Sequence, residues 1–235
     1  MKRPQLFLLH FAGGNCYSFQ FLTSRLKDFD VVPLELPGRG RRLKENLLKE
    51  FDQAAGDIFN QVMEKLTSDN FLIYGHSMGA YLALRITNML AEKEKFPICL
   101  FVSGNAGPDV RENKNRYLLA HDDFIAELKK LGGVPPEFTE NKELFDFFEP
   151  ILRADFEIAE RNNMKDEQPV SVPLYAMMGS EELHVDKIAN WARFTLLEFD
   201  YEVLPGDHFF IYDHPEKLAG IIKQNYKRMV MVPQL

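Results

Sequence analysis

Apolar residues in this chain gather in short continuous runs, and stretches with helical spacing separate most of these runs. Runs of this kind are typical of strands buried on both faces of a parallel sheet. The stretches between them place apolar residues on one stripe, as amphipathic helices do. The predicted strands are residues 5–10, 31–36, 71–74, 97–103, 172–178 and 201–204; the predicted helices around them are residues 18–26, 51–66, 78–90, 186–194 and 215–226. This alternation predicts an α/β fold of the doubly wound class, with a mostly parallel central sheet flanked by helices.

The alternation breaks between residues 105 and 168. No strand-like run occurs there, whereas residues 122–131 and 141–159 have helical spacing, with a Gly-Gly-Val-Pro-Pro link at residues 132–136. A simple crossover between parallel strands needs only about a dozen residues. We therefore expect one domain over residues 1–235 with an inserted helical lid at about residues 107–168, although a structural crossover remains the alternative.

Composition places the chain among ordinary globular proteins. It has 235 residues, of which 46% are hydrophobic and 27% charged, so a sizeable core is available. A net charge of −7 argues against a general nucleic-acid binder. The two cysteines, Cys16 and Cys99, lack metal-ligand spacing and suit a reducing compartment. Because no apolar run is long enough for a membrane span or fits a signal peptide, we expect a cytoplasmic protein with no membrane partner. We also expect a monomer.

One stretch carries a specific chemical signal. Residues 71–74 run directly into Gly75-His76-Ser77-Met78-Gly79, a G-x-S-x-G sequence between a predicted strand and a predicted helix. In a nucleophile elbow the turn is so tight that small residues are needed two places before and after the serine, which leaves the hydroxyl exposed. Ser77 is therefore the candidate nucleophile. An ordinary strand-to-helix turn is the alternative for this pentapeptide taken alone.

A serine hydroxyl needs a base to take its proton, and the base needs an acid to orient it. His208 follows the last predicted strand, where such a base is expected. For the acid, the loop after residues 172–178 offers Glu182, which we prefer to Glu181. Asp186 and Asp207 rank behind them, and a solvated acidic turn is also possible. The other histidines are expected to be structural or exposed, with His10 shaping the neighbouring glycine-rich loop; they are His10, His76, His121, His184 and His214.

The developing negative charge of an acyl transfer must be held by two backbone N–H groups, which form the oxyanion hole. One should be that of Met78, the residue after the nucleophile. The other should come from the glycine-rich loop after the first strand, from Ala12 in preference to Phe11. A phosphate-binding turn is the competing interpretation of that loop, but the loop lacks the spacing of the known phosphate motifs.

Several stretches together resemble the type II (editing) thioesterases of nonribosomal peptide and polyketide synthases. They occur in family order and cover nearly the whole chain: residues 10–14 (HFAGG), 35–40 (ELPGRG), 75–79 (GHSMG), 131–135 (LGGVP), 152–155 (LRAD) and 205–210 (PGDHFF). The resemblance implies an α/β-hydrolase fold with a helical lid. It also implies Ser77 as nucleophile, His208 as base, and Met78 with Ala12 as oxyanion donors. The family usually has aspartate where this chain has Glu182.

The resemblance further implies hydrolysis of acyl thioesters on the phosphopantetheine arm of carrier-protein partners, with no metal or cofactor of the enzyme's own. Arg39, Arg41, Arg42 and Lys44 form a basic run that could face an acidic carrier domain, while a solvated loop explains the run equally well. Two other functions remain open on the sequence alone: an oxygen-ester esterase or lipase of the same fold, and a non-catalytic hydrolase-like binding protein.

Overall fold

A single parallel sheet organises the chain. The computed structural model describes residues 2–110, 115–132 and 141–231. Its strands are β1 (Gln5–Leu9), β2 (Asp30–Pro33), β3 (Phe71–His76), β4 (Leu100–Ser103), β5 (Leu174–Gly179) and β6 (Phe199–Leu204). They lie in the order β2-β1-β3-β4-β5-β6, and every neighbouring pair is parallel. The predicted α/β class and mostly parallel sheet are confirmed.

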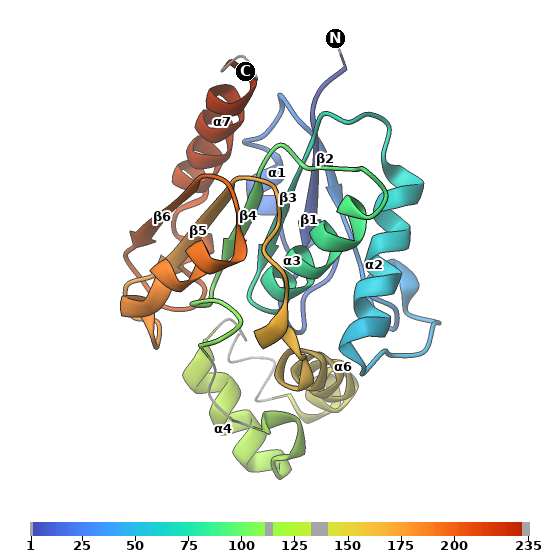
Figure 1. The fold of residues 1–235 in the computed structure, drawn as a ribbon. Coiled ribbons are helices and arrows are strands. Elements are labelled where there is room, and N and C mark those ends of the chain that lie inside the picture. The colour runs from blue at the N-terminus through green and yellow to red at the C-terminus, as the bar shows by residue number, and fades with distance from the viewer. Residues whose placement is uncertain (1, 111–114, 133–140, 232–235) are drawn as a thin grey trace.

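Helices cover both faces of this sheet, as Figure 1 shows. The α-helices are α1 (Gln20–Thr23), α2 (Phe51–Lys65), α3 (Met78–Ala91), α4 (His121–Leu131), α6 (Lys142–Arg161) and α7 (Pro215–Met231); short 3₁₀ helices are η1 (Gly40–Arg42), η2 (Arg116–Leu118), η3 (Met164–Asp166), η4 (Val185–Phe194) and η5 (Phe210–Tyr212). One core joins α2, α3 and η4 to one face of the sheet, and a second core joins α1 and α7 to the other. Alternate residues of β1 divide between them: Phe7 and Leu9 face the first core, Leu6 and Leu8 the second.

The segment between β4 and β5 holds α4 and α6, which lie together at one end of the sheet in Figure 1. Phe124 and Leu128 of α4 form a small separate core with Phe145 and Leu152 of α6. Most of the predicted Gly-Gly-Val-Pro-Pro link lies outside the described residues, as does the end of the C-terminal tail, residues 232–235. Because the carboxyl ends of parallel strands meet at this end of the sheet, α4 and α6 stand beside the place where a site is expected.

Some predicted elements are shorter or of another type. Residues 18–26 contain only the single turn α1, and residues 186–194 fall in the 3₁₀ helix η4 rather than in an α-helix. The second strand ends at Pro33, three residues earlier than predicted, and the Leu34 N–H makes one further bond to the Leu8 carbonyl. The last strand is not apolar on both faces, because β6 is an edge strand whose Tyr201 and Val203 are exposed. None of the helices in the described part of the chain is long and apolar enough to cross a membrane.

Candidate active site

Ser77 stands on a strained turn between β3 and α3. Its backbone angles are φ 55° and ψ −116°, which non-glycine residues rarely adopt. A Cβ on Gly75 would collide with the carbonyl oxygen of Gly79, and a Cβ on Gly79 would collide with that of Leu9. The two glycines thus let α3 turn back closely against β3 and β1, which is the geometry that the G-x-S-x-G spacing predicts.

This packing makes the elbow sensitive to one methyl group. We expect Gly75→Ala to lower the free energy of unfolding by about 3 kcal/mol or more, because the rigid backbone of Gly79 cannot move aside. Gly56→Ala is the matched control: Gly56 lies within α2, and a Cβ there meets nothing within 4 Å. That variant should be neutral or more stable by about 0.5–1 kcal/mol. Equal denaturation midpoints for the two variants would contradict the packing argument.

Three side chains from distant parts of the chain form one hydrogen-bonded series. His208, in the loop after β6, has its Nε2 3.0 Å from Ser77 Oγ and its Nδ1 2.7 Å from Glu182 Oε2. Because the Glu182 carboxylate can only accept, Nδ1 carries the proton and Nε2 is left to accept one from Ser77. The arrangement has the geometry required of a nucleophile, its base and the acid that orients the base.

The four acids that the sequence offers, of which Glu182 is preferred, differ in their contacts. Glu182 is the one that meets His208, and its other oxygen accepts the Gly179 N–H at 2.8 Å. This second bond fixes the carboxylate at the end of β5. Its neighbour Glu181 is exposed, and the carboxylate of Asp207 accepts the N–H of Phe209 at 2.7 Å. Asp186 lies in the first turn of η4 and is exposed.

A pocket of about 970 Å³ opens over these side chains. Its floor includes Ser77, His208, Met78 and Ala12, so the two expected oxyanion donors belong to residues that border the same space as the serine. Met78 is the first residue of α3, and amide groups at a helix N-terminus have no partner within the helix. The rest of the wall comes largely from the α4–α6 region, with apolar Leu128, Leu131, Leu152 and Phe156 and charged Arg116, Glu127 and Glu160.

Two further histidines near the site are buried and uncharged. His10 donates from Nδ1 to the carbonyl of Phe11 and accepts the Leu36 N–H at Nε2, so it serves the glycine-rich loop as expected. Burial, followed by the charge of Arg39, lowers the pKa of His10 to about 4. The pKa of His76 is lowered well below its usual value by burial and by His208, whose ring centre lies 5.0 Å away. Within the described part of the chain, none of the remaining histidines is hydrogen-bonded to Ser77. His121 bonds Glu149, His214 bonds the Pro205 carbonyl, and His184 borders the pocket.

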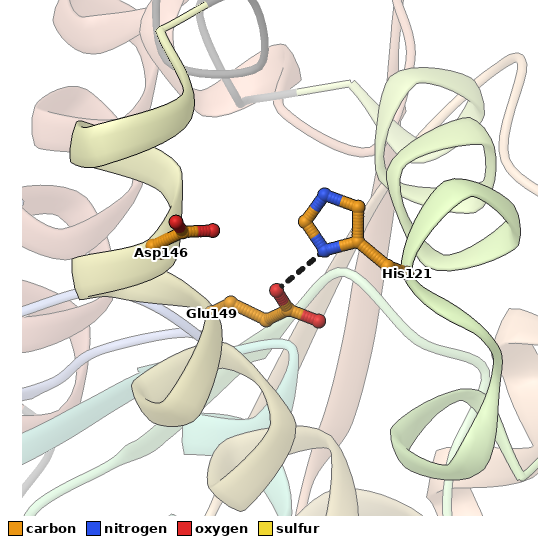
Figure 2. Close-up of side chains that lie close together, drawn as sticks. All are labelled: His121, Asp146 and Glu149. Atoms are coloured by element: carbon orange, nitrogen blue, oxygen red, sulfur yellow. Dashed lines mark hydrogen bonds and ion pairs between the residues drawn. The ribbon is translucent and has the colours of Figure 1, made fainter.

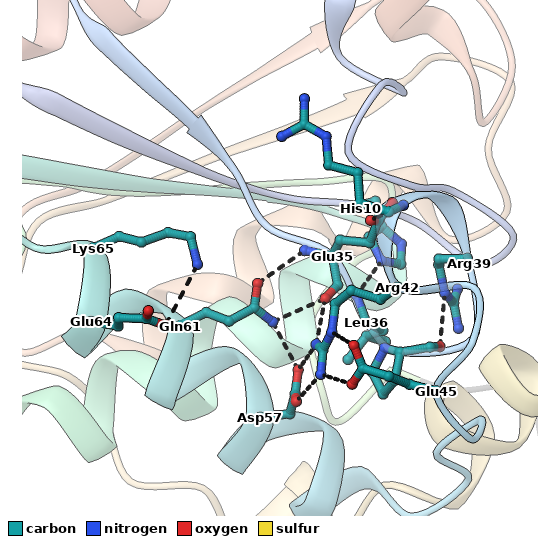
Figure 3. A network of polar contacts seen from close by, with 12 residues as sticks. His10, Glu35, Leu36, Arg39, Arg42, Glu45, Asp57, Gln61, Glu64 and Lys65 are labelled. Atoms are coloured by element: carbon teal, nitrogen blue, oxygen red, sulfur yellow. Dashed lines mark hydrogen bonds and ion pairs between the residues drawn. The ribbon is translucent and has the colours of Figure 1, made fainter.

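The predicted basic run is not a continuous cationic surface. Arg39 is buried, with 3% of its surface exposed, and forms an ion pair with the fully buried Asp155. Arg42 is held between Glu45 and Asp57 (Figure 3). Both interpretations of the run, a carrier-facing patch and a solvated loop, are therefore wrong for Arg39.

One group of possible metal-ligating atoms occurs among the described residues, outside the pocket. His121 of α4 approaches Asp146 and Glu149 of α6, and their ligand atoms lie within 4.8 Å of one another (Figure 2). Both carboxylates already have cationic partners: Lys142 binds Asp146 at 2.7 Å, and Arg153 binds Glu149 at 2.6 Å. We interpret the group as a polar contact that joins α4 to α6.

Asn105 contacts the elbow, although no sequence motif pointed to it. Its Nδ2 donates to the carbonyl of Ser77 at 3.0 Å, its Oδ1 accepts the Gly107 N–H, and Trp191 donates to its backbone carbonyl at 2.9 Å. Asn105 thus connects the elbow to the loop after β4. The one sequence signal for this role was an asparagine two residues after a predicted strand, at the carboxyl edge of the sheet.

The parallel sheet, the serine elbow after its third strand and the late histidine define an α/β hydrolase. The chain also matches a family model, the thioesterase domain, over residues 4–226. On this match, which spans most of its length, the chain belongs to the thioesterase domain family.

Individual relatives support this assignment. The chain is 31% identical to the gramicidin S biosynthesis protein GrsT of Aneurinibacillus migulanus, over 98% of this chain and 91% of that protein. Among solved structures it is similar to ClbQ from the colibactin NRPS/PKS pathway, with a TM-score of 0.91, 26% identity and coverage of 98% and 99%. It is also similar to YbtT, a type II thioesterase from the yersiniabactin NRPS/PKS pathway, with a TM-score of 0.87, 27% identity and coverage of 97% and 94%. The resemblance recognised in the sequence motifs is confirmed.

Proposed function

We propose that the protein hydrolyses acyl thioesters on the phosphopantetheine arm of synthase carrier proteins, and so regenerates carriers that hold stalled or incorrect acyl groups. The observation that carries this proposal is the hydrogen-bonded series Ser77–His208–Glu182 at the floor of a large pocket in a thioesterase-family chain. Relatives from several NRPS/PKS pathways support the choice of a carrier-bound substrate.

In the proposed mechanism, His208 Nε2 takes the Ser77 proton as the serine oxygen attacks the thioester carbonyl. The N–H groups of Met78 and Ala12 hold the resulting oxyanion. When the tetrahedral intermediate collapses, the C–S bond breaks, and the departing sulfur receives the proton from His208. A water molecule, deprotonated by the same histidine, then hydrolyses the acyl-serine and returns the free enzyme.

The substrate and its carrier supply the remaining parts of the reaction. The pantetheine arm belongs to the partner protein, and the proposed chemistry requires neither a metal nor a cofactor from this chain. A pocket of about 970 Å³ is at the upper end of the range for small-molecule sites and suits both an acyl group and the end of the arm. Its apolar α4–α6 wall suits the acyl group, which is the role that the predicted lid would have.

The test is release of free thiol from a panel of carrier proteins loaded with short and long acyl groups, together with release of the free acid from acyl-pantetheine thioesters and from matched esters in which oxygen replaces the sulfur. We expect turnover of the thioesters and much slower turnover of the esters. Equal or faster ester hydrolysis would instead support an esterase or lipase. Failure of an active-site phosphonate to label Ser77, together with no turnover, would support a binding protein.

The glutamate gives a separate prediction. Glu182→Gln removes the carboxylate that accepts the Nδ1–H of His208, so the imidazole is left free to adopt the wrong tautomer. We expect kcat to fall by about 10⁴-fold. Glu182→Asp keeps the charge on a shorter side chain and should lose far less. Glu181→Gln is the control, since that exposed neighbour should leave kcat unchanged within a few fold; a larger loss for Glu181→Gln than for Glu182→Gln would show that the acid is wrongly assigned.

A further inference from the structure

Two buried carboxylates hold the loop that carries Ala12. Residues 11–16, here called the oxyanion loop, bind one carboxylate at Gly13 and another at Cys16. Asp155 Oδ2 accepts the N–H of Gly13 at 2.7 Å, and Glu35 Oε1 accepts the N–H of Cys16 at 2.9 Å. Asp155 belongs to α6, so an element of the β4–β5 segment directly contacts a loop that follows β1.

Arg39 determines how Asp155 is oriented. Its Nη2 donates to Asp155 Oδ1 at 2.8 Å, and its Nη1 donates to Oδ2, the same oxygen that accepts the Gly13 N–H. Such a two-pronged contact fixes the plane of the carboxylate as well as its distance. Arg39 and Asp155 are 3% and 0% exposed, so water does not compete for either group.

Thermodynamic stability is a poor explanation for this pair. Two charges that are removed from water lose hydration energy, and apolar residues of similar size often stabilise a fold equally well. The pair does fix the direction of the Gly13 N–H. Glycine restricts its own backbone less than other residues do, so its conformation depends on such contacts. Gly13 has a φ of +78°, and the side chain of Leu152 of α6 lies against it.

We propose that Arg39 and Asp155 are positioning residues for the oxyanion hole. By holding the N–H of Gly13, they fix the peptide next to Ala12 and so keep the Ala12 N–H directed at the reacting carbonyl oxygen. The inference rests on the proposed function, and it assigns a role to the LPGRG and LRAD stretches, which the Ser77–His208–Glu182 series does not use. Because Asp155 lies on α6, the oxyanion hole is complete only while α6 is docked on the loop.

The test separates positioning from stability. Asp155→Asn keeps the shape of the side chain but loses the charge that orients Arg39; we expect kcat to fall by about 10²-fold, as for loss of one oxyanion donor, with KM unchanged within a few fold. The double variant Arg39→Met/Asp155→Leu removes both charges together and should fold, yet we expect it to be equally slow. Parent-like kcat in this folded double variant would overturn the inference.

A less buried ion pair elsewhere serves as control. Arg85 Nε and Glu167 Oε2 lie 2.7 Å apart, with side chains 25% and 8% exposed, and the pair joins α3 to the segment before β5. Arg85→Met/Glu167→Leu should therefore retain kcat within a few fold. A loss as large as that of the Arg39/Asp155 variants would show a general effect of removing buried charge and would overturn the inference.

Inhibitor binding supplies a second readout. The adduct of Ser77 with a trifluoromethyl ketone carries an oxyanion, so its affinity should weaken by the same factor as kcat/KM in the Arg39/Asp155 variants. Affinity for an uncleavable thioether analogue should stay constant, and an unchanged ketone affinity would overturn the inference. Absence of turnover by the parent protein on every thioester would overturn the proposed function instead, and the amide resonances of Ala12 and Gly13 would still show whether Asp155→Asn displaces the loop.

Discussion

Replacing Ser77 by alanine is expected to reduce kcat for thioester hydrolysis by about 10⁶-fold, because it removes the hydroxyl that forms the acyl intermediate in the proposed mechanism. Ser77 Oγ lies 3.0 Å from His208 Nε2 and borders the pocket. The smaller alanine fits the elbow without a new collision, so the variant should fold and still bind an acyl-carrier substrate. The measurement is single-turnover thiol release, with binding to an acylated carrier measured in parallel.

The matched control for this variant is Ser171→Ala, which changes an exposed serine just before β5. It should retain full activity. If Ser77→Ala kept more than about one per cent of the parent kcat, the nucleophile would be another group or a water molecule, and the acyl-serine mechanism would be wrong.

Replacing His208 by glutamine is expected to lower kcat by a similar factor, about 10⁶-fold, since the serine then has no base. The residual rate should rise with pH, because hydroxide must replace the imidazole. The double variant Ser77→Ala/His208→Gln should be no slower than either single variant, since the two residues act as a unit. Steady-state rates of all three variants between pH 6 and 10 test this.

A histidine in the same region provides the comparison. His214 lies six residues later and bonds the carbonyl of Pro205 at 2.8 Å. His214→Gln should therefore leave kcat within a few fold of the parent. Additive losses in the Ser77/His208 double variant, or a His214→Gln loss as large as that of His208→Gln, would contradict the assignment of His208 as the base.

The elbow and the sheet could be predicted from the sequence because each leaves a short sequence pattern. A Cβ on Gly75 would meet Gly79 in the same turn, and a Cβ on Gly79 would meet Leu9 of the neighbouring strand β1, so the fold requires glycine at both positions. Continuous apolar runs have few stable places other than a buried sheet. The position of His208 followed from chain order, because loops after parallel strands meet at one edge. The predicted type of an element was less accurate where it rested on residue spacing alone. The segment η4, for example, has the spacing of an α-helix but a 3₁₀ backbone.

The sequence already favoured Glu182 over Glu181, but the contact of Glu182 with His208 is visible only in the tertiary structure. The two are adjacent and chemically alike, and only the direction of the turn after β5 sends one carboxylate to His208 and the other to solvent. That direction depends on the β5–β6 pairing and on the Gly179 N–H, neither of which a sequence pattern records.

Charge patterns were the least reliable guide. Arg39 stands in a run of basic residues that looks exposed, yet the fold buries it against Asp155, a partner 116 positions away. Burial of a charge depends on a partner that only folding brings near, because an unpaired charge would be too costly to bury. The sequence by itself determined the class of fold and the expected places of Ser77, His208 and Glu182, which follow from motif spacing and chain order. The tertiary structure decided which carboxylate contacts His208, the burial of Arg39 and the contact of α6 with the oxyanion loop, since each depends on distant segments.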